Sequence, residues 1–459
     1  MAEVAAGAGI ALAAEEVLST TLQAGTATYF LAKPTQPLKA TFTRIAVVHD
    51  DDLHKRSLTR SNHTLTVIGS KAYVFGGENA DGQIASNEVH VFNLAPEKNK
   101  EPEYQLIPAI AGVGGGVPSG RTNHSACAFN DGLVIYGGHS TQNGTPADEG
   151  IIWMFNPDKK PDDKTWSILY SPRDHDAAAL DSASEVRVLP TSTFLLLLTG
   201  TKENGIENIH RFTPASSPGP KSNRYEALVK PPAGTSASNA AFHNDHLYLI
   251  SSSDAVSSQL HILPFAKKEE DDLKWTTLTF PTNPIVPGPR ARHAGALIPI
   301  STGYGRNYLI YLLGARSKSS KFTASTTSNF TEQDLSTFTS DKDDSAEEPT
   351  QWSDTWALQL PSSSLEPQAK LSVKDAIKPA KIKDAIRSGV GADSGKWSWA
   401  EVEVGVPDDL GDAEAGKLHP GPRALFGADV TADGSSIVFW GGENAEGEKM
   451  GDGWIVKFG

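Results

Sequence analysis

Two stretches of this chain repeat one pattern, and this repeat constrains the fold more than any other feature. The stretch from Arg60 to Gly77 reads RSNHTLTVIGSKAYVFGG, and the stretch from Arg121 to Gly138 reads RTNHSACAFNDGLVIYGG. Arg, His and Gly-Gly stand at identical offsets, and in each stretch two short apolar runs flank a polar turn. Two antiparallel strands joined by a tight turn give this pattern. The chain is therefore predicted to repeat a hairpin-based unit.

Four further units follow at intervals of about 50–60 residues, the spacing of a repeat architecture. They begin near Arg173, Ser238, Arg290 and Arg423. The first five units each supply four predicted strands, whereas the sixth supplies three. Residues 40–48 form a strand without a local partner, and pairing it with the sixth unit removes the open edges. We therefore expect an all-β, six-bladed propeller, closed by an N-terminal strand that completes the last blade.

The Gly-Gly pair after the second strand, the Tyr and Trp residues of later strands and the period resemble kelch repeats of the galactose oxidase/kelch superfamily. The resemblance extends over residues 40–459. PSGRTNH (118–124) and FWGGENAEGE (439–448) are also similar to plant nitrile/epithio-specifier kelch proteins, which redirect glucosinolate breakdown. The resemblance implies a kelch-type propeller, and it implies either a binding role or an enzyme-like one.

Specifier proteins bind iron through an acid-x3-Asp-x3-His spacing. Asp50 and His54 match its second half, but Ala46 stands where the acid should be. No metal and no cofactor are therefore predicted. The main hypothesis is a scaffold that binds a protein segment or a small polar or anionic ligand. The alternative is a metal-independent specifier-like or cyclisation-directing enzyme, and the sequence does not decide whether the chain is an enzyme.

The domain organisation predicted is an N-terminal tail at residues 1–39 and one propeller at residues 40–459. Two insertions interrupt the propeller. Residues 315–351 are rich in Ser, Thr and Asp without an apolar period, which predicts a disordered loop. Residues 365–395 include a basic stretch that predicts a helical insertion. This insertion is either a solvated excursion or a docking helix for an acidic partner or a membrane surface.

Charge and cysteine content narrow the class of partner and the compartment. The net charge of −14 over 459 residues argues against nucleic acid, whose phosphates need a basic surface. No apolar run approaches the ~20 residues of a transmembrane helix. The single cysteine, Cys127, allows no internal disulfide, and the first residues lack the basic region of a signal peptide. We expect a cytoplasmic protein.

Candidate site residues follow from the alternating strand direction in a blade. The loop before the first strand and the loop after the second strand open on the same face, around one mouth of the central channel. The predicted ligand-binding set on this face is Arg60, His63, Glu78, Arg121, His124, His139, Arg173, Arg290, His293, Arg423 and Glu443.

Two interpretations of this set remain open. Each Arg can tie neighbouring blades together through hydrogen bonds to carbonyl and carboxylate groups, with each His as a packed spacer. Alternatively, the Arg side chains line a pocket as bidentate donors to an anion. In unit four Thr235 takes the place of the arginine, and Ser238 that of the histidine, so the ring of basic side chains is open on that side.

Overall fold

The structure is a computed structural model of the 459-residue chain. It describes residues 38–47, 58–94, 103–112, 115–141, 147–157, 166–171, 184–215, 224–251, 259–265, 273–280, 288–303, 306–315, 351–361, 397–405 and 419–459. These residues are nearly all in strands, turns and loops, with a short 3-10 helix at Asp148–Gly150. No helix among them is long and apolar enough to cross a membrane.

The described strands form six blades and one short ribbon, and the prediction of an all-β, six-bladed propeller is confirmed. Blades one and two contain β3 (Thr64–Ile68), β4 (Lys71–Phe75), β6 (Val89–Asn93), β7 (Tyr104–Ile107), then β8 (Ser125–Phe129), β9 (Gly132–Tyr136), β10 (Ile152–Phe155) and β11 (Trp166–Tyr170). Blades three and four contain β12 (Glu185–Pro190), β13 (Leu195–Thr201), β14 (Gly205–Thr213), β15 (Arg224–Ala227), then β16 (Thr235–His243), β17 (His246–Ser251), β18 (Gln259–Pro264) and β19 (Thr276–Thr279). Blade five contains β20 (Ala296–Gly303), β21 (Arg306–Leu312), β22 (Thr355–Gln359) and β23 (Trp399–Glu401).

The sixth blade contains strands from both ends of the described chain. It consists of β25 (Gly427–Val430), β26 (Ser436–Trp440), β27 (Asp452–Phe458) and β1 (Lys39–Val47), with β24 (Glu403–Val404) outside them. β1 runs antiparallel to β27, with Ala40 opposite Phe458 and Phe42 opposite Val456. β24 pairs with β1 in parallel. The N-terminal strand therefore closes the ring, as the sequence predicted.

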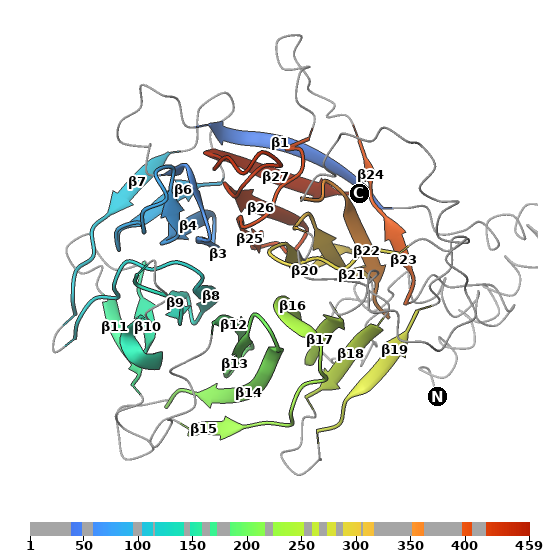
Figure 1. The fold of residues 1–459 in the computed structure, drawn as a ribbon, viewed down its shortest axis with the longest axis horizontal. Coiled ribbons are helices and arrows are strands. Elements are labelled where there is room, and N and C mark those ends of the chain that lie inside the picture. The colour runs from blue at the N-terminus through green and yellow to red at the C-terminus, as the bar shows by residue number, and fades with distance from the viewer. Residues whose placement is uncertain are drawn as a thin grey trace, which may run out of the picture.

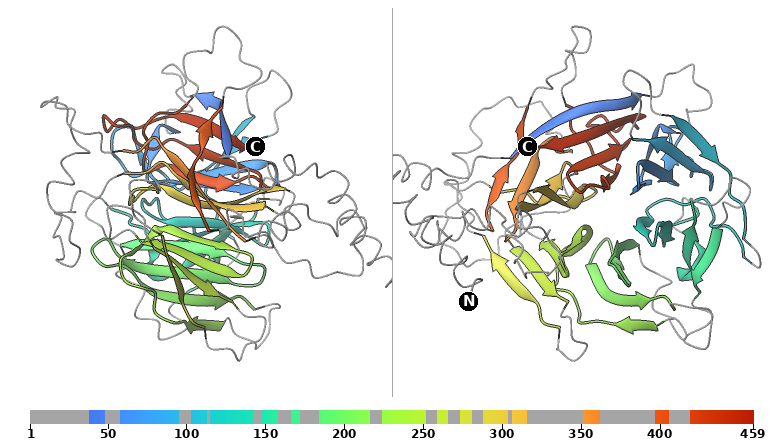
Figure 2. Two further views of the ribbon diagram at one scale, coloured as in Figure 1. Left: turned by 90° about the vertical axis from the view of Figure 1, so that its right-hand side faces the viewer. Right: turned by 180° about the vertical axis from the view of Figure 1, so that it is seen from behind.

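The blades stand around a common axis, with the first strand of each blade innermost (Figure 1). Figure 2 shows the same ring from the side and from behind. Tight turns join the first and second strands: Asn130 and Asp131 have φ of 48° and 59°, and Asn244 and Asp245 have 47° and 58°. Two successive residues in the left-handed region match the right-handed twist of the strands, and Asn and Asp tolerate that region best.

The core lies between the blades, where the facing sheets bury apolar side chains. Trp166 and Trp454 are fully buried. Phe92 of blade one stacks on Trp440 of blade six with ring centroids 4.6 Å apart, so this contact crosses the junction where the ring closes. Stacking of this kind contributes about 0.5–1.5 kcal/mol beyond the burial of area.

Both predicted insertions fall largely outside the described residues. Residues 1–37, 316–350 and 362–396 lie outside them, so the predicted tail, disordered loop and basic helix stay predictions. The two ends of the first insertion are described: Ala315 and Gln351 pair with each other, and Ala315 also pairs with His293. The insertion therefore leaves the ring beside the start of blade five.

Candidate functional site

One face of the ring carries the starts of the inner strands together with the turns that follow the second strands. The Gly-Gly pairs lie there, so we call it the GG face. The short ribbon of β2 (Arg60–Ser61) and β5 (Glu78–Asn79) also lies on this face and joins the two kinds of loop within blade one. The predicted site residues are best judged by what their side chains contact on the GG face.

The predicted arginines of blades one, two and six are buried inside the ring. Arg60, Arg121 and Arg423 are each at most 1% exposed. In each case Nη1 donates to the carbonyl oxygen of the first glycine of the pair: Arg60 to Gly76 (2.8 Å), Arg121 to Gly137 (3.0 Å) and Arg423 to Gly441 (3.3 Å). The guanidinium groups therefore fix the end of the second strand in their own blade, rather than joining neighbouring blades as one interpretation of the sequence expected.

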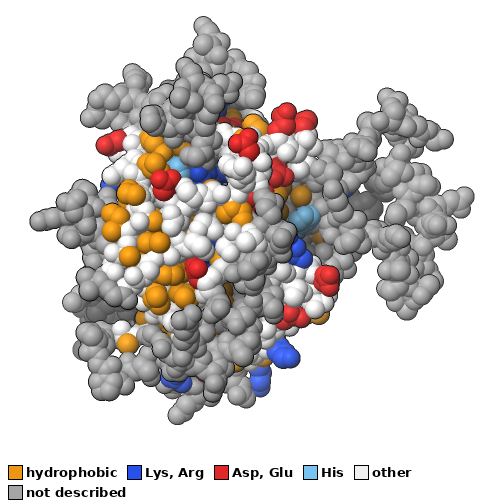
Figure 3. Space-filling view, turned by 60° about the vertical axis from the view of Figure 1, so that its left-hand side comes forward, with side chains coloured by type: hydrophobic (Ala, Val, Ile, Leu, Met, Phe, Trp, Pro, Cys, Tyr) orange, Lys and Arg blue, Asp and Glu red, His pale blue; other side chains and the backbone are white. Residues whose placement is uncertain are grey.

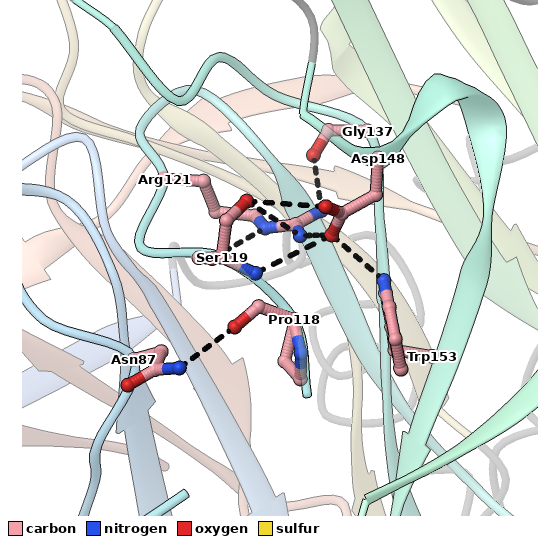
Figure 4. Close-up of polar contacts among 7 residues, drawn as sticks. All are labelled: Asn87, Pro118, Ser119, Arg121, Gly137, Asp148 and Trp153. Carbon is pink, nitrogen blue, oxygen red and sulfur yellow. Dashed lines mark hydrogen bonds and ion pairs between the residues drawn. The ribbon is translucent and has the colours of Figure 1, made fainter. Parts of the chain in front are cut away.

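A carboxylate and an indole complete the environment of Arg121 (Figure 4). Arg121 Nη2 forms an ion pair with Asp148, and Trp153 Nε1 donates to Asp148 Oδ2 over 2.9 Å. Arg121 Nε donates to the carbonyl oxygen of Ser119 over 3.1 Å. Burial lowers the pKa of Arg121 to about 10, so the side chain stays charged at neutral pH. Every nitrogen of this guanidinium thus has a protein acceptor.

The same Arg–Asp–Trp arrangement recurs in blade six. Arg423 forms an ion pair with Asp452, and Trp454 Nε1 donates to Asp452 Oδ2 over 2.8 Å. The carboxylate of Asp452 is 12% exposed, against 1% for the guanidinium. A charge-assisted pair of this kind is strong because the geometry is fixed and water is largely excluded.

Blade five contains this arrangement at a position two residues later than the sequence predicted. Arg292, and not Arg290, is buried, and it donates to Leu313 O (3.0 Å) and to both oxygens of Asp354 (2.9 and 3.0 Å). Trp356 Nε1 donates to Asp354 Oδ2 over 2.7 Å.

The backbone explains the shift. The second residue after Arg60, Arg121, Arg292 and Arg423 has a positive φ in each case: Asn62, Asn123, Ala294 and Leu425, at 55°, 55°, 53° and 59°. The chain turns into its first strand at this residue. Counting from Arg290 misses the turn, whereas counting from Arg292 finds it.

Arg290 itself is exposed, and its guanidinium lies 5.2 Å from the ring centroid of Trp352. His293 is also exposed. The two residues predicted for blade five, Arg290 and His293, therefore lie at the surface of the GG face. The buried ion pair with Asp354 is made by Arg292 instead. Arg173 lies outside the described residues.

In blade one the Asp–Trp pair is replaced by a histidine. Arg60 Nη2 lies 3.0 Å from His90 Nε2, and His90 Nδ1 lies 2.9 Å from the hydroxyl of Tyr104. Burial lowers the pKa of His90 to about 2, and the charge of Arg60 acts in the same direction. His90 is therefore neutral, and its Nε2 accepts from Arg60.

The predicted histidines His63 and His124 are packed between blades. His124 Nε2 lies 2.9 Å from the hydroxyl of Thr64 in the preceding blade, and its ring meets Phe75 edge-on at 5.4 Å. Burial lowers the pKa of His63 to about 3 and holds that of His124 well below its ordinary value. The charges of Arg60 and Arg121 lower these pKa values further. Both rings are thus neutral spacers in the folded protein.

Glycine is required where neighbouring blades meet at this face. A Cβ atom on Gly76 would lie 2.5 Å from the carbonyl oxygen of Arg121 in the next blade, and Gly76 has φ of 63°. Beside it, Gly77 N donates to Arg121 O over 2.8 Å. The same bond joins Gly442 N to Arg60 O (2.9 Å) and Gly314 N to Arg423 O (2.8 Å). The repeated motif therefore holds blades five, six, one and two to one another.

The predicted glutamates also act across blade boundaries. Glu443 accepts from the hydroxyl of Ser61 over 2.8 Å, and Glu78 accepts from the hydroxyl of Thr122 over 3.1 Å. Glu78 also pairs with Lys449 at 3.4 Å. Both carboxylates remain half-buried, as does His139. They form a polar rim above the buried arginines.

Blade four departs from this scheme and gathers different polar groups, which we call the blade-four cluster: Glu185, Lys202, Ser236, Ser238 and His293. Glu185 of blade three accepts from Ala237 N (3.1 Å) and from the hydroxyl of Ser236 (3.3 Å). The Ser236 and Ser238 hydroxyls lie 3.1 Å apart. The loop after β13 touches the start of β16, since a Cβ on Gly205 would lie 2.1 Å from Thr235 O.

Charges from blades three and five converge on this cluster. Burial raises the pKa of Glu185, while its hydrogen bonds and the charge of Lys202 oppose that rise. Partial burial lowers the pKa of His293, and the charge of Lys202 lowers it further. Lys202 therefore lies within electrostatic reach of a carboxylate on one side and an imidazole on the other. Sequence reasoning named only His293 and Ser238 here.

The carboxylates that hold the arginines were also missed. Asp354 and Asp452 each stand two residues before a Trp, at the start of the third strand. This Asp-x-Trp pattern was a usable signal, although blade two disguises it because Asp148 lies five residues before Trp153.

The described residues contain no group of three or more His, Cys, Asp and Glu side chains arranged to hold a metal ion. Seen from the side that carries β7 and β11, acidic and basic side chains are scattered among hydrophobic ones (Figure 3). The exposed hydrophobics of this region include Leu106, Ile110 and Ile168.

Comparison with known proteins supports the repeat assignment. The family model of the KLHDC2/KLHL20/DRC7 Kelch-repeats domain matches residues 54–251, somewhat less than half of the chain. Kelch domain-containing protein 3 of rat is 28% identical over 105 residues, and that of human is 29% identical over 106 residues. Each match covers 21% of this chain and 25% of the relative, so the chain matches about a quarter of the length of these curated relatives.

Among solved structures, that of YjhT aligns with a TM-score of 0.48 and 13% identity, covering 87% of this chain and 97% of that one. The predicted similarity to plant specifier proteins is not shown by these comparisons and stays a prediction. Kelch propellers serve in general as protein-binding scaffolds. The chain folds as a six-bladed propeller, and residues 54–251 of it match a kelch-repeat family model.

Proposed function

We propose that this protein is a binding scaffold whose GG face, centred on the blade-four cluster, holds an extended segment of a partner protein. A small polar or anionic ligand is the second kind of occupant compatible with the same groups. The observation that carries the proposal is a difference between the two halves of the ring. In blades five, six, one and two the buried arginines bond to other groups of the protein. The rim of blades three to five instead presents a carboxylate, an ammonium, an imidazole and hydroxyls.

The members of the predicted site set divide accordingly. Arg60, Arg121 and Arg423 each donate to groups within the protein, so they support the shape of the face. Arg290, and His293 of the blade-four cluster, are exposed and can meet a ligand directly. An extended polypeptide presents backbone amides and side chains of both charges. A rim with acidic and basic groups close together provides complementary partners for them.

The charged character of this rim supports binding over the metal-independent enzyme alternative. An enzyme that steers a reactive small molecule needs an enclosed, mostly apolar site from which water is excluded. Lys202 and His293 are instead exposed. An exposed rim recognises a surface or a segment better than it encloses a small substrate.

The test is selection of a random dodecapeptide display library on the purified protein, followed by titration of the selected peptides against variants. Lys202→Ala and Ser238→Trp should each weaken binding by about tenfold or more, since each removes or covers part of the blade-four cluster. Lys71→Ala is the matched control, because Lys71 is also exposed but begins β4, directly after the turn between the first two strands, on the opposite face. Peptides that bind all variants alike would place the binding surface elsewhere.

A further inference from the structure

A second set of charged groups lies inside the ring, away from the GG face. Arg187 belongs to β12, the inner strand of blade three, and Asp429 belongs to β25, the inner strand of blade six. These blades are three positions apart in a ring of six, so they face each other across the axis (Figure 1). Arg187 and Asp429 nevertheless influence each other electrostatically. The two side chains therefore lie within electrostatic reach of each other inside the ring.

Asp429 is held in place by backbone donors. Its Oδ2 accepts from Val67 N of blade one over 2.8 Å, and its Oδ1 accepts from Val430 N over 2.8 Å. Val67 N belongs to the inner edge of β3, which no neighbouring strand covers. The carboxylate is thus fixed against blade one rather than extended toward Arg187.

Arg187 is not satisfied in the same way. Its Nε atom is buried and has no hydrogen-bond partner, and its guanidinium makes no ion pair with any residue that the structure describes. Arg423 Nε is also buried without a partner, but the Nη atoms of Arg423 bond to Asp452 and to backbone oxygens, whereas no such bond is found for Arg187 among the described residues. A buried polar group without a hydrogen-bond partner costs free energy. An ion bound from solution is one partner that removes this cost.

Arg187 and Asp429 are both half-buried, although both belong to inner strands, six of which surround the ring axis. A side chain that keeps accessible surface at such a place borders an interior space at least as large as a water molecule. A planar guanidinium with free donors beside such a space matches the geometry of an oxyanion.

We propose that the ring axis carries a binding site for one small oxyanion, held by Arg187 and opposed by the carboxylate of Asp429. The site is distinct from the GG face and does not depend on the function proposed for that face. Because Asp429 is negatively charged when ionised, anion binding is strongest when this carboxyl group is protonated. Binding of the anion and of a proton are therefore coupled.

The groups that face Asp429 determine the pH range of this coupling. Arg187 from β12 and the Cys127 thiol from β8 lie within its electrostatic reach, and the N–H groups of Val67 and Val430 bond to it. His63 of blade one packs against Gly427, two residues before Asp429, and is neutral above about pH 3. Burial raises the pKa of Asp429 to about 6, while its hydrogen bonds and Arg187 oppose that rise. Anion affinity should therefore fall as pH rises through about 6.

The experiment uses formate, whose charge is constant between pH 5.5 and 8, titrated into the full chain at fixed ionic strength with chloride as the balancing salt. Wild-type protein should bind formate about tenfold more tightly at about pH 5.5 than at about pH 8. Arg187→Met should reduce affinity at least tenfold at both pH values. Asp429→Asn should bind tightly at both and lose the pH dependence. Lys202→Ala, which alters the GG face, should behave as wild type.

Crystals soaked in selenate give an independent location for the ion through the anomalous signal of selenium, which should lie on the ring axis beside Arg187. Formate binding that is unchanged in Arg187→Met, or that remains equally pH-dependent in Asp429→Asn, would overturn the proposal. The two variants act in opposite directions, so a general loss of folding cannot reproduce the expected result. No formate binding by wild-type protein at either pH would also overturn it, whatever the peptide selection shows.

Discussion

The arginine of blade five offers a direct test of which residue ties the blade together. Arg290 and Arg292 are two residues apart and chemically identical, but only Arg292 is buried. Replacing each by Met removes the charge and keeps a side chain of comparable length. Arg292→Met should lower the free energy of unfolding substantially, whereas Arg290→Met should leave it nearly unchanged.

The expected magnitude follows from the contacts that each change removes. Arg292→Met removes the hydrogen bonds to both carboxylate oxygens of Asp354 and to Leu313 O, as well as longer ones to Asp354 O (3.4 Å) and Arg290 O (3.3 Å), and leaves that carboxylate without its cation. Breaking a buried ion pair from one side costs about 3–5 kcal/mol. The side chain of Asp354 is 23% exposed and keeps the Trp356 N–H, so we expect about 2–4 kcal/mol.

Arg290→Met removes an exposed contact between the guanidinium and Trp352, at 5.2 Å from the ring centroid. Contacts of this kind contribute about 0.5–1 kcal/mol at exposed sites. The two substitutions should therefore differ by well over 1 kcal/mol, although their chemistry is the same.

Urea-induced unfolding followed by tryptophan fluorescence measures both values. Adding Asp354→Asn to Arg292→Met should cost less than the sum of the two single changes, because the second substitution removes the charge that the first left unpaired. Equal unfolding free energies for Arg290→Met and Arg292→Met, or strictly additive effects in the double variant, would refute the assignment of Arg292 as the tie.

Three further predictions follow from the fold. Deleting residues 1–47 should cause aggregation by exposing the edge of β27, whereas a protein lacking residues 1–36 keeps β1 and should remain monodisperse on gel filtration. Gly76→Ala should cost more than about 3 kcal/mol, because its Cβ would meet a backbone oxygen, while Gly69→Ala, with open space around it, should cost about 1 kcal/mol in urea unfolding. His63 binds a proton near pH 6.5 when unfolded but only near pH 3 when folded, so its stabilising contribution is complete above about pH 6.5 and falls by about 1.4 kcal/mol per pH unit below it. His63→Gln should therefore flatten the decline of stability between about pH 6 and 4.

The fold was predictable because the information that specifies it is local and repeated. The Gly-Gly pairs, the polar turns and the alternating apolar runs each determine a few neighbouring residues, and six copies reinforce one another. The unpaired strand at residues 40–48 then left a single way to close the ring, and β1 at Lys39–Val47 pairs with β27 as expected.

The site was less predictable because it depends on which side chains are buried, and spacing alone does not report burial. The two open interpretations of the arginines are a case in point: Arg121 has the same sequence context whether it faces a ligand or Asp148. Choosing the right arginine in blade five required the backbone conformation at Ala294. The sequence does not indicate a positive φ there, because alanine seldom adopts one. Arg187 and Asp429 are 242 positions apart, and only the closed ring brings them together.

The uneven distribution of ties around the ring gives a physical reason for a binding surface near blade four. Blades five, six, one and two are joined through backbone bonds such as Gly77 N to Arg121 O, which require glycine at fixed positions. Blades three, four and five are joined instead through side chains: Glu185 accepts from Ala237 N (3.1 Å), and Asn239 Nδ2 donates to Arg292 O (3.1 Å).

Bonds that run through side chains allow more variation in the surrounding loop than a bond that depends on glycine and positive φ. The loops of blades three and four are therefore less constrained by closure of the ring than those of the other blades. Polar residues such as Lys202 can change there without loss of the fold. In such a propeller the glycine-dependent bonds join the blades of one half only. The binding groups of the other half can therefore vary while the scaffold keeps its structure. On this argument, Lys202→Ala should alter recognition with little effect on stability, whereas Arg121→Met should do the reverse.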